Sequence, residues 1–300
     1  MGNRASKLRS VADALADVRD GSMIIIGGSL FHNKPMTLVR ELVRRRMRGL
    51  TVITPCQASI DADLLISAGC VAEVRLPYMG FDYLGLSPGF RKGTSDGTLR
   101  AWECDETQVL CALESAAKDL PSGLVKTGVG TDLPRVNPDL KEVQDPITGE
   151  AMIAVGAFKP EFALLHAAAG DMYGNLRYPG YSFADLIAAE ATRRSGGTVI
   201  ASVDEVVPLS HTERDPHRTD VSQMLVDFVV DAPFGAHPCS SHGNYQFDEA
   251  GLQRYLQAAR EDAMDDYVAQ FVDQVPTQDA YLDRHVKPST IVALRRGIHG

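Results

Sequence analysis

Residues 20–28 read Asp-Gly-Ser-Met-Ile-Ile-Ile-Gly-Gly, and this stretch decides the fold of the chain. Its centre, from Met23 to Ile26, is a short apolar run with β-branched side chains, as expected for a strand buried on both faces. The Asp-Gly pair before it ends a helix predicted over residues 5–18, and the two glycines after it open a loop. A second helix begins near Pro35, a residue that the first helical turn accepts. This order of strand, glycine loop and helix predicts the first unit of an α/β fold.

The same alternation continues along the chain. Strand-like runs are separated by helical runs of about 10–15 residues, which is the pattern of βαβ units and a mostly parallel sheet. The predicted fold class is therefore α/β, an open, mostly parallel sheet flanked by helices. We expect a single domain over residues 1–300, with a C-terminal helical segment from about residue 248. The further predicted strands are residues 51–54, 71–76, 98–102, 162–167, 198–203 and 225–230.

Some segments carry local signals rather than a clear period. Residues 78–97 and 121–150 are rich in glycine and are predicted to form long loops, which in compact domains usually serve function. Ser182 with Asp185 three positions later predicts a capping box at the start of a helix. His166 lies within an apolar strand, and we expect a core histidine with satisfied hydrogen bonds.

Composition excludes several classes of function. The net charge of −9 argues against nucleic acid as a partner, because phosphate contacts need clustered Lys and Arg. No apolar run reaches the roughly 18 residues of a membrane helix, so no membrane partner is expected. The first ten residues lack the apolar core of a secretory signal, which indicates a cytoplasmic protein. The dispersed cysteines and histidines predict reduced thiols and no metal site.

The common nucleotide-binding and hydrolase motifs are absent. The patterns GxxxxGK[ST], GxGxxG and GxSxG do not occur. What remains is Gly27-Gly28-Ser29 at the end of the first strand, where open α/β sheets bind their ligands. Glycines let backbone N–H groups approach a ligand oxygen, and such donors suit the oxyanion formed when a thioester carbonyl is attacked. The alternative interpretation is a tight turn that needs small residues.

The order of these features resembles the class I coenzyme A transferase family, in particular its α subunits. The resemblance begins with the Asp-Gly-x-x-Ile-x-x-Gly-Gly pattern of residues 20–28, continues through Gly130-Thr131-Asp132, and spans roughly residues 12–235. The glutaconate CoA-transferase α chains are similar. The resemblance is strongest at Phe-Ala-Leu-Leu-His (162–166), Asp-Met-Tyr-Gly-Asn-Leu (171–176) and Val-Asp-Glu-Val-Val (203–207).

The family resemblance implies a mechanism and a partner. A glutamate carboxylate of the β chain attacks an acyl-CoA thioester, and CoA thiolate then converts the resulting anhydride into a glutamyl-CoA thioester. A second carboxylic acid finally accepts the CoA. The resemblance thus implies a hetero-oligomer with a CoA-transferase β subunit, with coenzyme A as a substrate and no permanently bound cofactor. We expect the substrate-binding residues of this chain to be Gly27, Gly28, Ser29, Tyr78 and Gly130, although Tyr78 also fits a packing role.

One stretch favours a different reaction. Trp102-Glu103-Cys104-Asp105-Glu106 is more similar to the α chains of steroid-ring-opening CoA-ester hydrolases. Those relatives hydrolyse a carbon–carbon bond of a CoA-linked cyclic diketone, and they use an α-chain glutamate. Glu103 and Glu106 are both candidates for that catalytic residue, and both also fit carboxylates that favour a helix N-terminus. The sequence does not decide between them.

Two departures bear on these alternatives. The hydrolases carry Arg-Arg-Lys-Pro before the second helix, whereas residues 32–35 here read His-Asn-Lys-Pro. A third hypothesis is a non-catalytic regulator that binds an acyl-CoA or a sugar phosphate, because related folds serve in sensing. No helix-turn-helix is visible near the N-terminus to support that hypothesis.

Overall fold

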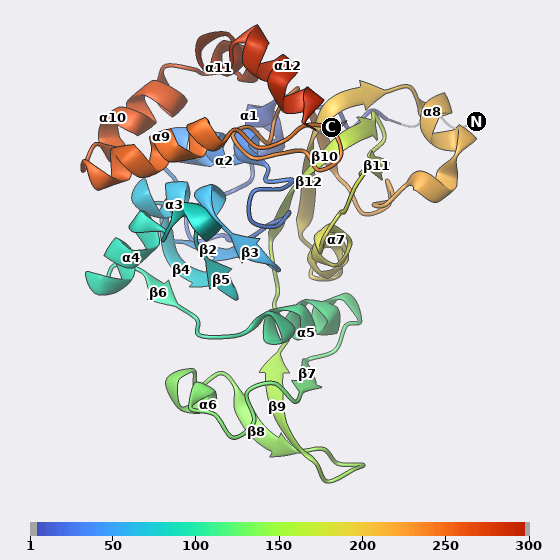
Figure 1. Ribbon diagram of the computed structural model, residues 1–300. Helices are drawn as coiled ribbons and strands as arrows, with labels where there is room; N and C mark the ends of the chain where they lie inside the picture. Colours follow the sequence, from blue (N-terminus) through green and yellow to red (C-terminus); the bar gives the residue numbers. More distant parts are fainter. Residues whose placement is uncertain (1–4, 298–300) are drawn as a thin grey trace.

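The computed structural model describes residues 5–297, and a parallel sheet forms its centre (Figure 1). The strand order is β13-β12-β10-β1-β2-β4-β6, every neighbouring pair along this path is parallel, and β11 pairs antiparallel with β10. The predicted α/β class is confirmed. The strands are β1 (Met23–Ile26), β2 (Leu50–Ile53), β4 (Val71–Arg75), β6 (Arg100–Ala101), β10 (Phe162–Asp171), β11 (Leu176–Arg177), β12 (Thr198–Val207) and β13 (Phe228–Asp231).

Strand β1 lies in the middle of the sheet, as its sequence predicts. It pairs with β2 on one side and with β10 on the other, and Ile24, Ile25 and Ile26 are fully buried. From β1 the strand order proceeds outward in both directions, so the topological switch point lies between β1 and β10. Open sheets bind ligands at this point, beyond the carboxyl ends of the strands.

Helices cover both faces of the sheet. Ile24 and Ile26 belong to a core cluster with α2 (Met36–Arg44), α3 (Ile60–Ser67) and α9 (Glu249–Arg260). Ile25 belongs to a second cluster on the other face, because successive side chains of a strand alternate between its faces. The helices of that second face are α5 (Glu106–Ala117) and α7 (Asp185–Arg194).

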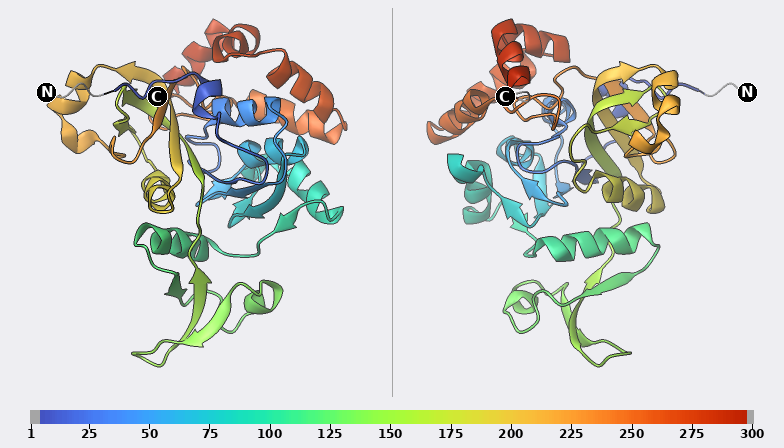
Figure 2. Two further views of the ribbon diagram at one scale, coloured as in Figure 1. Left: turned by 180° about the vertical axis from the view of Figure 1, so that it is seen from behind. Right: turned by 45° about the vertical axis from the view of Figure 1, so that its right-hand side comes forward.

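The C-terminal part is helical, as predicted from about residue 248. Helix α9 leads into α10 (Met264–Val268), a π-helical turn (Ala269–Asp273), α11 (Gln278–His285) and α12 (Pro288–Arg296). Figure 2 shows these helices together at one end of the molecule. None of the helices within residues 5–297 is long and apolar enough to cross a membrane.

The two predicted loops contain regular structure. Residues 78–97 hold β5 (Tyr78–Met79), a 3-10 turn (Asp82–Leu84) and α4 (Pro88–Ser95), while β5 pairs with β3 (Gln57–Ala58). The second segment forms most of a separate antiparallel sheet of order β7-β9-β8, which projects beside α5 (Figure 1). Its strands are largely exposed, so they lack the apolar run that marks a buried strand. They are β7 (Ser122–Val125), β8 (Lys141–Gln144) and β9 (Ala151–Gly156), with α6 (Leu133–Val136) between β7 and β8.

The predicted helix over residues 5–18 is wrong in length. Only α1 (Val11–Ala14) is helical, and Ser10 caps it by accepting a hydrogen bond from the Asp13 amide. Before the cap, Leu8 forms a bridge with Val229 of β13, so this segment extends the sheet edge instead. Two short helical segments near the edge complete the described chain, α8 (Leu209–Arg214) and a 3-10 turn (Pro216–Arg218). The first four residues of the predicted single domain, which also begin the N-terminus predicted to lack a secretory signal, lie outside the described range.

Candidate functional site

The loop after β1 requires both of its glycines. Gly28 has a φ of +70°, which L side chains rarely adopt, and an added Cβ would overlap the carbonyl oxygens of His32 and Asn33. At Gly27 an added Cβ would collide with a carboxylate oxygen of Asp185. The loop is therefore packed closely against its neighbours, and space alone explains why these positions are glycine.

The backbone donors of this loop are already occupied. The Gly27 amide donates to the Leu164 carbonyl at 2.9 Å, and the Ser29 amide donates to the His32 carbonyl at 3.0 Å. The amide of Gly28 donates to Asp185 Oδ1 at 2.8 Å. The predicted presentation of these amides to an oxyanion is therefore not seen in the chain by itself, and the small-residue turn describes the loop better.

The carboxylate beneath the loop was assigned incorrectly from the sequence. Asp185 is the first residue of α7, with Ala184 and not Ser182 at the cap position, so the predicted capping box is wrong. Its side chain is fully buried and points at the glycine loop, where its second oxygen accepts a hydrogen bond from Tyr178 Oη at 2.8 Å. Burial raises the pKa of Asp185 to about 6, against the opposing effects of the Gly28 amide and the Tyr178 hydroxyl.

A buried ion pair lies on the other side of the loop. Lys34 Nζ lies 3.0 Å from Asp61 Oδ2, and both side chains are fully buried. Lys34 Nζ also donates to the Gly28 carbonyl at 3.5 Å, while Asp61 Oδ1 accepts from the Ser59 amide at 2.8 Å. The sequence suggested only that Asp61 favours the start of α3, and the buried partner gives it a different role.

Glu106 and Cys56 meet at the carboxyl end of the sheet. Cys56 follows β2, and Glu106 is the first residue of α5, where Asp105 rather than Glu106 makes the capping box with Gln108. Burial raises the pKa of the Cys56 thiol to about 12, and the charge and hydrogen bond of Glu106 raise it further. Lys34 is also close enough to affect this thiol. Glu106 therefore has a defined neighbour beside the glycine loop.

The other candidate glutamate is placed differently. Glu103 is exposed, and its backbone carbonyl accepts a hydrogen bond from Asn137 Nδ2 at 2.7 Å. No contact among residues 5–297 joins the Glu103 carboxylate to the glycine loop. Glu106 is consequently the better placed of the two.

The remaining predicted substrate contacts are spread out. Ser29 is buried, and its amide and carbonyl pair with His32. Tyr78 is 41% exposed in the small β3–β5 sheet. Gly130 lies in a turn between β7 and α6 with a φ of +73°, and an added Cβ there meets nothing within 4 Å. The structure thus brings Ser29 to the glycine loop and leaves Gly130 in the projecting sheet.

Sequence reasoning missed the side chain that the loop carries. His32 Nδ1 lies 2.6 Å from Ser240 Oγ, and its ring is close to Phe183 and His242. Burial, followed by the charges of His242 and Lys34, lowers the pKa of His32 to about 4, which keeps the imidazole neutral. The departure from Arg-Arg-Lys-Pro at residues 32–35 was the only signal of this group in the sequence.

Backbone strain gathers at the same place. Leu30, Asn33 and Phe183 all have positive φ values, of 48°, 54° and 51° respectively. Such conformations cost about 1–3 kcal/mol each and persist only where the surrounding structure holds them, which is common at functional sites. His166, by contrast, is the buried core histidine that was predicted, with Nδ1 2.9 Å from Ser202 Oγ and Nε2 3.3 Å from Asp204 Oδ1, the latter without hydrogen-bond geometry.

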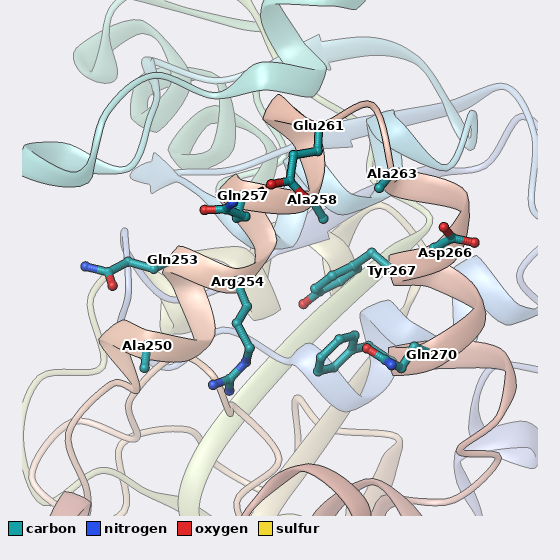
Figure 3. Close-up of a pocket in the computed structure, with 11 residues that line it drawn as sticks. Ala250, Gln253, Arg254, Gln257, Ala258, Glu261, Ala263, Asp266, Tyr267 and Gln270 are labelled. Carbon is teal, nitrogen blue, oxygen red and sulfur yellow. Dashed lines mark hydrogen bonds between the residues drawn. The ribbon is translucent and has the colours of Figure 1, made fainter.

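Two cavities are large enough for a small molecule. One, of about 550 Å³, lies between α9 and α10, and Figure 3 shows Arg254 and Tyr267 facing it, away from the glycine loop. The other, of about 460 Å³, lies at the ends of β10 and β12 and shares Tyr178 with the Asp185 network. We favour the second as the site, because ligands of open sheets bind at the carboxyl ends of strands. Its lining includes Ala168, Ala169, Arg177, Tyr178, Glu205 and Asn244.

Comparison with known proteins agrees with this geometry. A family model described as coenzyme A transferase matches residues 8–232. The IpdA component of a cholesterol ring-cleaving hydrolase from Rhodococcus jostii is 34% identical over 87% of this chain and 89% of that protein. A protein of Archaeoglobus fulgidus is 30% identical over 93% of this chain, which spans only 62% of that relative.

Glutaconate CoA-transferase of Acidaminococcus fermentans provides a structural comparison. The first of its two kinds of chain, the α chain, is 29% identical over 93% of this chain and 92% of that one. The crystal structure of that enzyme matches with a TM-score of 0.89 at 27% identity and covers 97% of this chain and 96% of its counterpart. The similarity therefore includes the C-terminal helices, beyond the limit near residue 235 that the sequence suggested.

Proposed function

Because the chain belongs to the coenzyme A transferase family, we propose that it is the α subunit of a heteromeric enzyme that moves CoA between carboxylic acids. The observation that carries this proposal is the likeness to the α chain of glutaconate CoA-transferase, which extends over almost the full length of both chains. The substrates would be an acyl-CoA and a free carboxylic acid, and coenzyme A itself would be the transferred group.

The reaction would use a glutamate of the β chain as the nucleophile. Its carboxylate attacks the thioester carbonyl and releases CoA thiolate, which then attacks the carboxyl carbon of the resulting anhydride. This releases the first acid and leaves a glutamyl-CoA thioester, and the second acid takes the CoA by the reverse steps. The buried carboxylate of Asp185 is already hydrogen-bonded twice within this chain, which supports a nucleophile from elsewhere.

In this proposal the α chain forms one wall of the site. The loop at Gly27, Gly28 and Ser29 would shape the space around the acyl group, and Tyr78 and Gly130 would contact more distant parts of the substrates. Apolar side chains such as Tyr181, which is 70% exposed, would be covered by the β chain. Expressed alone, the chain should therefore aggregate, whereas co-expression should give a defined hetero-oligomer.

A second candidate function is hydrolysis of a carbon–carbon bond in a CoA-linked cyclic diketone. Two observations favour it, namely the 34% identity to the IpdA component of the ring-cleaving hydrolase, and the place of Glu106 beside Cys56. In that reaction Glu106 would take a proton from the attacking water, since a positioned carboxylate can act as a general base.

An acceptor experiment separates the two functions. The co-expressed complex is incubated with an acyl-CoA, with and without a second carboxylic acid, and both free CoA and the new thioester are measured. A transferase forms a new acyl-CoA only when the second acid is present. Release of a ring-opened product without any acceptor would replace the transferase by the hydrolase, and failure of both reactions across acyl and cyclic substrates would reject an enzymatic role.

A further inference from the structure

The backbone on both sides of the Gly28 Cα is held by buried charged residues. The peptide group before it donates through the Gly28 amide to Asp185 Oδ1 at 2.8 Å. The peptide group after it accepts at the Gly28 carbonyl from Lys34 Nζ at 3.5 Å. Because one contact fixes each peptide plane, the two together determine both φ and ψ of the residue at the end of β1.

Each of the two holding residues is itself supported. Tyr178 donates to the second oxygen of Asp185, and Asp61 pairs with Lys34 at 3.0 Å. Asp185, Lys34 and Asp61 are all fully buried, and burying charged groups costs several kcal/mol unless partners compensate for the lost water. Asp185 receives its hydrogen bonds from neutral donors, so its place beneath the loop is expensive in free energy.

What the loop carries explains such an arrangement. His32 pairs with Ser29 through both backbone groups, and Asn33 donates from its side chain to the Tyr181 carbonyl and accepts from the His242 amide. A rotation of the peptides at Gly28 would move this whole turn. The positive φ values at Leu30 and Asn33 show that the turn is strained and needs support from its surroundings.

We propose that Asp185 and Lys34 are positioning residues that hold the two peptide groups at Gly28 and thereby fix the turn at residues 29–33 within the site. The consequence for catalysis rests on the proposed function, whereas the effect on the turn does not. Asp185 touches no reacting atom and acts through the loop, and Tyr178 orients the Asp185 carboxylate.

The chain contains a matched control of the same chemistry. Asp63 in α3 is also fully buried, and it accepts hydrogen bonds from Tyr255 Oη at 2.7 Å and from the amides of Gly89 and Phe90. This second Asp–Tyr–glycine arrangement joins α3, α4 and α9 and lies outside the site. Loss of the Asp63 carboxylate therefore reports general destabilisation of the fold.

The test compares Asp185→Ala, Asp185→Asn, Tyr178→Phe and Asp63→Ala in the co-expressed complex. Amide hydrogen exchange of residues 28–33 is followed by mass spectrometry, together with kcat and KM for the reaction that the wild-type enzyme catalyses. We expect Asp185→Ala to speed exchange in residues 28–33 and to lower kcat about 100-fold with little change in KM, because small misplacements of a site have effects of this size.

The other variants decide whether the effect is specific. Asp185→Asn should keep most of kcat, since its amide can accept from the Gly28 N–H and donate to Tyr178 Oη. Asp63→Ala should speed exchange around residues 88–92 and leave residues 28–33 and kcat near their wild-type values. If Asp185→Ala does not fold, Tyr178→Phe gives a milder version of the same comparison.

Two results would overturn the inference. One is unchanged exchange in residues 28–33 when Asp185→Ala, or Tyr178→Phe in its place, is compared with the wild type. The other is an equal loss of kcat in Asp63→Ala, which would make the effect one of stability alone. A wild-type complex without transferase or hydrolase activity would reject the proposed function, and the exchange comparison would still decide whether the two residues hold the loop.

Discussion

The buried carboxyl of Asp185 should leave a measurable mark on the pH dependence of stability. Its pKa in the folded chain is raised to about 6 from an ordinary value of 3.8, chiefly by burial. A raised pKa means that the folded state prefers the protonated acid, so the associated stability is present at low pH and is lost as pH rises through about 6. The difference between the two pKa values corresponds to about 3 kcal/mol.

Asp185→Asn removes this titration while keeping the shape of the side chain. The free energy of unfolding of the wild type, minus that of Asp185→Asn, should therefore fall by about 3 kcal/mol between about pH 4 and pH 7. Urea unfolding of the co-expressed complex at one fixed protein concentration measures it, and taking the difference cancels the other titrating groups, provided that they do not interact with residue 185. A difference that stays constant across this pH range would refute the reasoning, because Asp185 would then have the same pKa in both states.

Three further predictions concern single residues. Gly28→Ala should destabilise the complex by at least about 1–3 kcal/mol in urea unfolding, because of its positive φ and the overlap with two carbonyls, and an unchanged midpoint would contradict this packing. Cys56 should react with iodoacetamide about 1,000-fold more slowly than an ordinary thiol, since its pKa is raised from 9.0 to about 12, and peptide mapping would show rapid labelling if this is wrong. Glu103→Ala and Glu106→Ala should both retain transferase activity if the nucleophile lies on the β chain, whereas loss of several orders of magnitude in Glu106→Ala alone would favour the hydrolase.

The fold was largely predictable because its signals are local and strong. The run from Met23 to Ile26 reads as a strand buried on both faces, and it forms the centre of the sheet. The antiparallel sheet at residues 122–156 was not predictable in the same way, since its strands are short, mostly exposed and interrupted by turns. The amphipathic pattern of residues 5–18 was misleading, because pairing of Leu8 with the edge strand competes with the helix.

The site was predictable at its glycine loop and hardly beyond it. Asp185 has the spacing of a helix cap from Ser182, and only the tertiary structure shows that it faces a loop more than 150 positions away. The pairing of Lys34 with Asp61 and the contact of Cys56 with Glu106 also join separate segments. Periodicity and motif spacing describe neighbours along the chain, so contacts between distant segments leave no such signal.

The central claim is that this chain is a CoA-transferase α subunit whose partner carries the nucleophile, and chemical trapping tests it most directly. The co-expressed complex is incubated with an acyl-CoA and then with borohydride, which reduces a glutamyl-CoA thioester to an alcohol, and the modified peptide is located by mass spectrometry. We expect modification of one glutamate on the β chain and none on this chain. Modification of a glutamate in this chain would contradict that assignment.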